Sequence, residues 1–346
     1  MQRRDMVKAL GVAAGAGWIG VRPQADWKAW RVNGVRVNGF LEGMSKIGRT
    51  PEGGYARTGF SDFDIEGRRY TAGLLEQAGL DVAVDAAGNI IGRRAGTQPG
   101  ALPILFGSHV DSVPNGGNYD GPVGSLSAIE VATTLKERGY RNRHPLWVTV
   151  WADEENGLTG SRGFLGEIPP AELARPGRDG AVLAEQIKRV GGRPEAMIAE
   201  RHDKGSMAGY FELHIEQGGN LDRDGINIGV VEGIVGIRAF DVTITGFANH
   251  AGTTPMDRRQ NALLAAAELV LSVDRIVRAE PGRQVGTIGR LAVKPGAQNV
   301  IPGEVALTVE LRDLSMDKLD RLWQAIRAET DRTMTRYKTS WAFVER

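Results

Sequence analysis

The 346-residue sequence contains no cysteine, which excludes disulfide bonds, thiolate nucleophiles and metal centres held by cysteine. Histidine is scarce as well, with five in the whole chain: His109, His144, His202, His214 and His250. Any metal site must therefore be built from these few imidazoles together with Asp and Glu carboxylates.

An excess of one sign of charge is also absent, because 43 Lys and Arg residues are balanced by 42 Asp and Glu residues. A net charge of +1 produces no strong field toward nucleic acid or a membrane surface, and we expect neither as a partner. The hydrophobic fraction of 41% is ordinary for a soluble globular protein, and the length favours two domains over one.

The first 25 residues differ in kind from the rest of the chain. Arg3 and Arg4 precede a mild Ala- and Gly-rich apolar stretch, residues 6–21, which contains Lys8 and is too short to span a membrane. This combination is typical of a twin-arginine export signal, although a frayed amphipathic N-terminus has a similar composition. We therefore predict a periplasmic or exported protein, with a cytoplasmic location as the alternative, and exclude residues 1–25 from the fold assignment.

Residues 107–124, GSHVDSVPNGGNYDGPVG, follow a short apolar run at residues 102–106 that predicts a buried strand. His109 and Asp111 stand at the carboxyl end of that strand, and Asp120 begins the next helical run. Open α/β sheets bind their ligands just outside the carboxyl ends of strands. A histidine and carboxylates in this position suit a divalent metal such as zinc.

The hydrophobic pattern predicts two architectures in succession. Over residues 26–235, strands alternate with helices, which is typical of a doubly wound α/β sheet. There we expect strands at 81–84, 89–93, 102–106, 146–151 and 211–215, and helices at 27–41, 61–79, 125–138 and 182–190. Over residues 236–346 the order becomes β-α-β-β-α-β, the ferredoxin-like unit. Its expected strands are 237–245, 284–293, 304–312 and 339–345, and its expected helices are 258–278 and 316–337.

Three predicted strands end in a pair of acidic or histidine side chains: His109 with Asp111, Glu154 with Glu155, and His214 with Glu216. The ends of parallel strands lie side by side, so these pairs can converge. A two-metal site needs a bridging carboxylate, terminal His and Glu ligands, and a free carboxylate that activates water. Glu154 and Glu155 suit the last two needs, although two adjacent glutamates are more often solvated surface.

Several motifs, in order over residues 27–346, resemble one known family: GSHVDSVPNGGNYDGPVG, ADEENG with GSRGF, ELHIEQGG, GFANHAGTTPMDRR, and GAQNVIPGEV with ELRD. They are similar to the di-metal amidohydrolases related to aminoacylases and zinc carboxypeptidases. The most similar branch contains N-carbamoyl-L-amino-acid hydrolases, allantoate amidohydrolases and β-ureidopropionases. The HIEQG block separates this branch from the peptidases, because it resembles a histidine ligand where they carry an acid.

The resemblance implies a role for each matching residue. One metal would be held by His109, Asp120 and His214, and Asp120 would bridge to a second metal that Glu155 also binds. Glu154 would be the general base, and Asp111 would orient His109. The implied substrate-binding residues are Gln217, His250, Asn299 and Arg312, with His250 also stabilising the tetrahedral oxyanion.

The resemblance also implies the fold and the reaction. The fold would be a zinc-carboxypeptidase-like sheet domain with helices on both faces, residues 26–235, and an α+β ferredoxin-like lid that makes a homodimer, residues 236–346. The reaction would be metal-dependent hydrolysis of a linear C–N amide bond in N-carbamoyl-L-amino acids or related ureido compounds such as allantoate and β-ureidopropionate. An aminoacylase or dipeptidase is the alternative enzyme, which the HIEQG block disfavours.

One ligand that the resemblance implies has no counterpart in the sequence. The family carries two divalent metals per subunit (Zn, or Mn, Co or Ni), and its fifth ligand is a histidine in a Gly-rich return segment after the lid. The sequence has no histidine after His250, and neither His144 nor His202 matches a ligand motif. We therefore expect one bound metal and little or no activity in this chain. A truncated non-catalytic remnant that binds one metal and dimerises is the alternative to an active enzyme.

Overall fold

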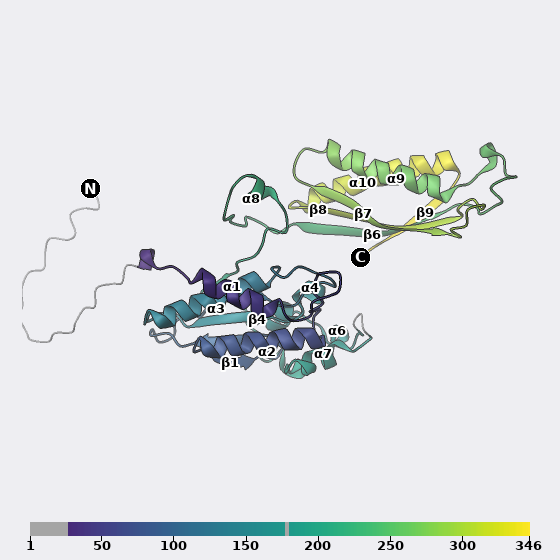
Figure 1. Cartoon of the computed structure of the whole chain (residues 1–346). Helices are drawn as coiled ribbons and strands as arrows, with labels where there is room; N and C mark the ends of the chain where they lie inside the picture. Colours follow the sequence, from purple (N-terminus) through teal and green to yellow (C-terminus); the bar gives the residue numbers. More distant parts are fainter. Residues whose placement is uncertain (1–26, 177–179) are drawn as a thin grey trace, which may run out of the picture. The chain divides into compact units, whose positions relative to one another are not determined.

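The computed structural model in Figure 1 describes residues 27–176 and 180–346, so the predicted export signal lies outside the described residues. The chain divides into two compact units, the first ending at Gly225 and the second beginning at Ile226. The first unit carries the predicted metal ligands, and the second carries three of the four predicted substrate-binding residues.

A five-stranded sheet with the order β1-β2-β4-β3-β5 forms the centre of the first unit. Its strands are β1 (Asp81–Val84), β2 (Ile90–Arg94), β3 (Ile104–His109), β4 (Leu146–Trp151) and β5 (Gly209–Phe211). Strand β3 is parallel to both of its neighbours, β4 and β5, whereas β2 is antiparallel to β1 and β4. The carboxyl ends of β3, β4 and β5 therefore meet at one edge of the sheet, as the sequence pattern predicts.

Helices pack on both faces of this sheet, which confirms the expected α/β fold class. The longer helices are α1 (Gly34–Met44), α2 (Asp62–Gln77) and α3 (Pro122–Glu137). They share one core with Val148 and Val150 of β4, while Phe164 packs on the other face with Leu105 and Trp151. The shorter helices are α4 (Glu154–Gly157), α5 (Thr159–Phe164), α6 (Pro170–Leu173), α7 (Leu183–Arg189) and α8 (Asn220–Arg223), with 3₁₀ turns at Trp27–Ala29 and Pro194–Ala196.

Several predicted elements of the first unit differ in extent from the structure. The strand expected at residues 102–106 is Ile104–His109, and the helix expected at residues 125–138 is Pro122–Glu137. The helix expected at residues 27–41 begins only at Gly34, because the Asn33 side chain accepts the Arg36 N–H and so caps the helix there. The strand expected at residues 211–215 ends at Phe211. Beyond it the chain approaches α3 so closely that a Cβ on Gly124 would lie 2.1 Å from the Leu213 carbonyl oxygen, and the segment leaves the sheet.

The second unit has the βαββαβ order that the sequence predicts. Its elements are β6 (Gly236–Thr245), α9 (Ala262–Ala279), β7 (Val285–Lys294), β8 (Glu304–Asp313), α10 (Met316–Tyr337) and β9 (Ser340–Glu345), with a 3₁₀ turn at Met256–Arg258. The sheet is antiparallel throughout, with the order β7-β8-β6-β9. Its core joins Phe240 and Val309 on the strands to Leu269 on α9 and Ile326 on α10.

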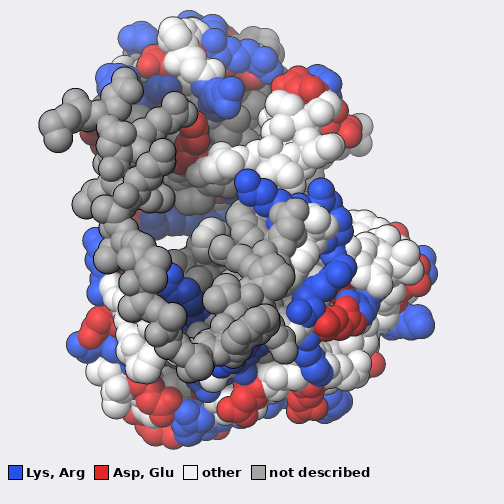
Figure 2. All heavy atoms as spheres, turned by 90° about the vertical axis from the view of Figure 1, so that its left-hand side faces the viewer, with Lys and Arg blue, Asp and Glu red and all other residues white. Residues whose placement is uncertain are grey.

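The surface of the described residues shows charges of both signs. Figure 2 shows Lys and Arg interspersed with Asp and Glu over the coloured part of the face that it draws. Among residues 27–176 and 180–346, no helix combines the length and the apolar character that crossing a bilayer requires.

Asp64 and Arg68, one turn apart on α2, form a buried polar pair in the first unit. Asp64 accepts a hydrogen bond of 2.9 Å from the Phe60 N–H, and Arg68 donates to the Gly88 carbonyl. Burial raises the pKa of the Asp64 carboxyl to about 7, although the charge of Arg68 opposes that rise. The Asp64 carboxyl therefore titrates within the pH range in which the protein would be handled.

The raised pKa of Asp64 predicts a pH-dependent stability. The folded state holds the proton of the Asp64 carboxyl more tightly than the unfolded chain does. The stability that this proton contributes to the fold is therefore fully present below about pH 4 and is lost as the pH rises through about 7. In the metal-free protein, the free energy of unfolding should fall more steeply between pH 5 and 8 than in the Asp64→Asn variant. Between these two pH values, the unaltered protein should lose at least about 1.4 kcal/mol more unfolding free energy than the variant, which is the value of one pKa unit. Urea unfolding at a series of pH values measures it, and parallel curves for the two proteins would contradict it.

Candidate metal centre

Three of the predicted ligands come together at the sheet edge. His109 lies at the end of β3, Asp120 precedes α3, and His214 follows β5. Each offers one ligand atom, and these atoms all lie within 4.8 Å of one another. His214 Nε2 is 3.1 Å from Asp120 Oδ1, and the two imidazole rings are 5.8 Å apart between centroids. The described residues thus include a group that is able to hold a metal ion.

Asp111 lies behind His109, as the sequence motif implies. Nδ1 of His109 is 3.1 Å from the Asp111 carbonyl oxygen and 3.4 Å from its Oδ1, and both residues are buried. With Nδ1 engaged on this side, Nε2 is directed toward the other acidic groups. The second carboxylate oxygen of Asp111 accepts the Glu155 N–H at 3.1 Å, so one side chain contacts two predicted ligand residues.

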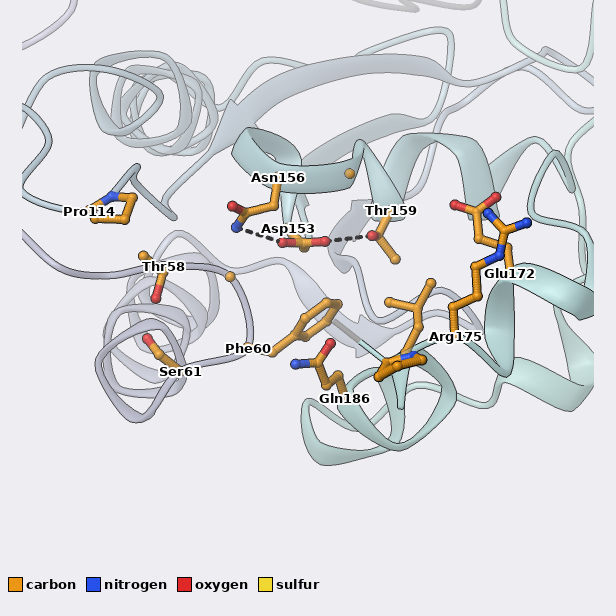
Figure 3. A pocket seen from close by; sticks show the side chains of 14 residues that line it. Thr58, Phe60, Ser61, Pro114, Asp153, Asn156, Thr159, Glu172, Arg175 and Gln186 are labelled. Atoms are coloured by element: carbon orange, nitrogen blue, oxygen red, sulfur yellow. Dashed lines mark hydrogen bonds between the residues drawn. The ribbon is translucent and has the colours of Figure 1, made fainter. Parts of the chain in front are cut away.

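Glu154 and Glu155 are placed differently from the expectation. They do not extend from the end of β4 but form the first turn of α4, after Asp153 turns the chain with a left-handed φ of 50°. Figure 3 shows the Asp153 carboxylate between Asn156 and Thr159, whose side chains donate hydrogen bonds of 3.0 and 2.6 Å to it. The two glutamates are thus held by a helical turn, which the strand pattern could not indicate.

A pocket of about 600 Å³ adjoins this turn (Figure 3). Its labelled lining residues are Thr58, Phe60, Ser61, Pro114, Asp153, Asn156, Thr159, Glu172, Arg175 and Gln186. Among the described residues, the lining includes none of the predicted metal ligands, so the pocket is distinct from the metal-binding group.

The electrostatics of the sheet edge favour a bound cation. Burial lowers the pKa of His109, but the hydrogen bond and charge of Asp111, with the charges of Glu154 and Glu155, outweigh it and raise the pKa to about 9. Burial, together with neighbouring carboxylates, raises the pKa of both Glu154 and Glu155, and His109 opposes the rise. Glu154 Oε2 is 3.6 Å from His109 Nε2.

The carboxylates of Asp120 and Asp111 also fit a metal ion. Oδ1 of each is buried without a well-formed hydrogen bond, and the nearest histidine nitrogens lie 3.1 Å from Asp120 Oδ1 and 3.4 Å from Asp111 Oδ1. Carboxylate oxygens close to histidine nitrogens are ligands that a divalent metal such as zinc prefers. The residues present therefore fit a divalent metal.

Gln217, a predicted substrate-binding residue, contacts the metal-binding group directly. Its amide Nε2 donates a hydrogen bond of 2.7 Å to Asp120 Oδ2, and its φ of 56° is in the left-handed region.

In the second unit, the segments of His250 and Asn299 lie side by side, since Ala251 N–H donates to the Asn299 carbonyl at 2.9 Å. Arg312, near the end of β8, is exposed and pairs with Glu310 at 2.7 Å.

A network behind the ligands was not predicted from the sequence. Ser108 donates a hydrogen bond of 2.6 Å to Glu212, which also accepts one at 2.5 Å from the Tyr210 hydroxyl. Trp151 Nε1 in turn donates to that hydroxyl at 2.8 Å. These contacts link the ends of β3, β4 and β5. The only sequence signal for this network is Glu212 in the ELHIEQ segment, because the register of the strands decides which side chains meet it.

Comparisons with known proteins agree on one family. The sequence profile of peptidase family M20/M25/M40 matches residues 105–334. N-carbamoyl-L-amino acid amidohydrolase of Geobacillus stearothermophilus is 40% identical over 306 residues, which cover 86% of this chain and 75% of the relative. Ureidoglycolate hydrolase of Arabidopsis thaliana is 36% identical over 289 residues, 79% of this chain and 60% of the relative. The crystal structure of a hydantoinase/carbamoylase family amidase from Burkholderia multivorans superposes with a TM-score of 0.83 at 35% identity, covering 91% of this chain and 77% of that one.

Proposed function

The chain belongs to peptidase family M20/M25/M40, and we propose that it is a metal-dependent hydrolase of a linear C–N amide bond in N-carbamoyl-L-amino acids or related ureido compounds. The observation that carries the proposal is the group His109, Asp120 and His214 at the joint ends of β3 and β5, with Glu154 beside it. Relatives named N-carbamoyl-L-amino acid amidohydrolase, ureidoglycolate hydrolase and allantoate deiminase support the substrate class.

A divalent ion, Zn or alternatively Mn, Co or Ni, would be held by His109, Asp120 and His214. Such an ion supplies Lewis-acid chemistry, polarising the amide carbonyl and lowering the pKa of a water. Asp111 holds His109 with Nε2 directed toward the carboxylates, and Glu155 would join Asp120 in binding any second ion.

Glu154 is the general base of the proposed reaction. Its pKa is raised by burial and by neighbouring carboxylates, and a base with a pKa nearer neutrality accepts a proton from water more effectively. The proton leaves the water as its oxygen attacks the ureido carbonyl, and it is then available to the departing nitrogen. Glu154 is not a member of the three-ligand group, which leaves its carboxylate free for this task.

Four further residues would bind the substrate. The amides of Gln217 and Asn299 have the donors and acceptors that a ureido group requires. The guanidinium of Arg312 matches a substrate carboxylate bidentately, and His250 would stabilise the oxyanion that forms on the carbonyl. In this proposal residues 26–235 are the catalytic domain, and residues 236–346 are the lid and the homodimer interface. Sedimentation velocity of the purified chain tests the dimer.

The substrate class is tested by comparing hydrolysis of four compounds after loading the chain with Zn, Mn or Co. We expect little or no turnover by this chain. The ammonia that it does release should come from N-carbamoyl-L-methionine or another ureido compound, such as allantoate, and a chelator should stop the release. Faster cleavage of an N-acetyl amino acid or a dipeptide would favour the aminoacylase or dipeptidase alternative. A folded, metal-loaded chain that hydrolyses none of them would favour the non-catalytic alternative.

The number of bound metals is a second prediction. Three protein ligands are sufficient for a catalytic-type zinc site, whereas Asp120 and Glu155 alone provide a second ion with carboxylates and no imidazole. Imidazole is a favoured ligand for borderline metals, so the second ion should be lost readily. We expect about one metal per chain after dialysis, measured by elemental analysis. Two tightly bound metals would mean that another residue completes the second site.

Export is a third prediction, and it rests on the sequence of residues 1–25. If Arg3 and Arg4 belong to a twin-arginine signal, replacing both with Lys should retain the protein in the cytoplasm of a bacterial host. Cell fractionation with an antibody against the chain measures this. Equal export of the unaltered and doubly substituted proteins would remove the periplasmic location.

A further inference from the structure

Arg57 is a fully buried cation on the chain segment that runs beside the metal centre. Its Nε donates to the Val110 carbonyl at 3.1 Å, and its Nη1 donates to the Ile47 carbonyl at the same distance. Its backbone exchanges two further bonds with Ser112: the Arg57 N–H donates to Ser112 Oγ at 3.1 Å, and the Ser112 N–H donates to the Arg57 carbonyl at 3.0 Å. Arg57 thus holds the residue before Asp111 and the residue after it.

This arrangement bears directly on the ligands, because Asp111 contacts two of them. One side of Asp111 faces Nδ1 of His109, and its Oδ2 accepts the backbone N–H of Glu155. A displacement of the backbone at Val110 would therefore move the Asp111 carboxylate. The imidazole of His109 and the first turn of α4 would follow.

The charge of Arg57 also connects it to Asp111. A buried guanidinium is costly unless carboxylates compensate it, and the charges of Asp64 and Asp111 are among those that act on Arg57. Nη2 of Arg57 is buried without a hydrogen-bond partner, and Oδ1 of Asp111 is buried with only Nδ1 of His109 nearby, at 3.4 Å. Nothing in the proposed reaction requires an arginine at this depth, so the cost of its burial points to a role in organising its neighbours.

We propose that Arg57 is a positioning residue of the metal centre: it holds the backbone on both sides of Asp111 and, through that carboxylate, sets the positions of His109 and Glu155. The inference rests on the metal site of the proposed function. It adds a residue more than fifty positions before Asp111 whose hydrogen bonds are made to Ile47, Val110 and Ser112.

The test compares the zinc affinity of the full chain with that of Arg57 variants, using competition with a chromophoric chelator. Removing an outer partner of a metal ligand typically costs roughly 10- to 100-fold in affinity, so Arg57→Met should weaken zinc binding by about that factor. Arg57→Lys keeps the positive charge and one hydrogen-bond donor, so its zinc affinity should lie between that of the unaltered chain and that of Arg57→Met. The absorption spectrum of bound Co²⁺ should change as well, because it reports ligand geometry.

Arg68→Met is the matched control for the hydrogen bonds of Arg57. Arg68 is also buried and also interacts with the charge of Asp111, but it donates to Gly88 and not to the residues around Asp111. Thermal unfolding shows the fraction folded for each variant. If Arg57→Met does not fold, Arg57→Lys decides the test. We expect the Arg68 variant to lose stability while its folded fraction retains zinc affinity close to that of the unaltered chain. Equal losses of zinc affinity in the Arg57 and Arg68 variants would overturn the inference.

A double-mutant cycle with Asp111→Asn supplies the readout that a purely structural role would not affect. If Arg57 acts through Asp111, the two substitutions should lower zinc affinity by less than the product of their separate factors. Full multiplication of the two factors would contradict the inference. An unaltered chain that binds no zinc would overturn the proposed metal site itself, whereas normal zinc binding by both Arg57 variants would overturn only the role of Arg57.

Discussion

Glu154→Gln is expected to reduce kcat for ureido hydrolysis by roughly a hundredfold or more in a two-metal form of the protein that turns over, while leaving the metal content unchanged. The amide has the shape of the carboxylate but cannot accept the proton from water. The three-ligand group does not include Glu154, so no ligand is lost. Steady-state kinetics with an N-carbamoyl-L-amino acid, together with elemental analysis of the same sample, measure both quantities.

Glu155→Gln is the informative comparison for this result. Glu155 lies in the same turn of α4, and its backbone N–H donates to Asp111 irrespective of its side chain. If Glu155 is a ligand and Glu154 the base, Glu155→Gln should weaken the binding of a second metal. Its effect on kcat should then be reversed in part by a higher metal concentration, whereas that of Glu154→Gln should not. Activity of Glu154→Gln within about tenfold of the unaltered chain would exclude Glu154 as the base.

Loss of His214 should be a severe change for metal binding. A four-ligand zinc site is worth about 10–16 kcal/mol, so one imidazole contributes roughly 3 kcal/mol and its removal should cost more than a hundredfold in affinity. His214→Ala leaves His109 and Asp120 as the members of the group. Zinc titration against a chelator of known affinity measures the change.

His144→Ala is the matched control for that experiment. His144 is partly exposed, its Nδ1 lies 2.8 Å from the Leu102 carbonyl oxygen, and it belongs to no cluster of metal-ligating side chains in the described residues. Zinc affinity should be unaffected by its removal. If His214→Ala and His144→Ala bind zinc equally well, the metal lies elsewhere than at the ends of β3 and β5.

Much of the metal centre follows from the sequence because its elements are specified locally. The apolar run of β4 and the alternating pattern of β8 predict strands, and the long amphipathic period predicts α10 with the bounds Met316–Tyr337 that the structure has. Parallel strands then bring their carboxyl ends together, so His109 and His214 could be expected at one edge. One strand prediction failed for a tertiary reason. The apolar residues after Phe211 resemble a strand, but the close approach of α3 at Gly124 takes them out of the sheet.

The sequence by itself determined the kinds of side chain available, the order of the elements and the family, since each depends on composition, period and motif. Only the tertiary structure decided which atoms meet. Gln217 donates to Asp120 across 97 residues of chain, and Arg57 holds Val110 across 53. Such contacts depend on how helices and loops pack against strand ends, and they require ångström-scale placement of donors and acceptors. Hydrophobic period specifies which face of an element is buried, and it carries no information about that placement.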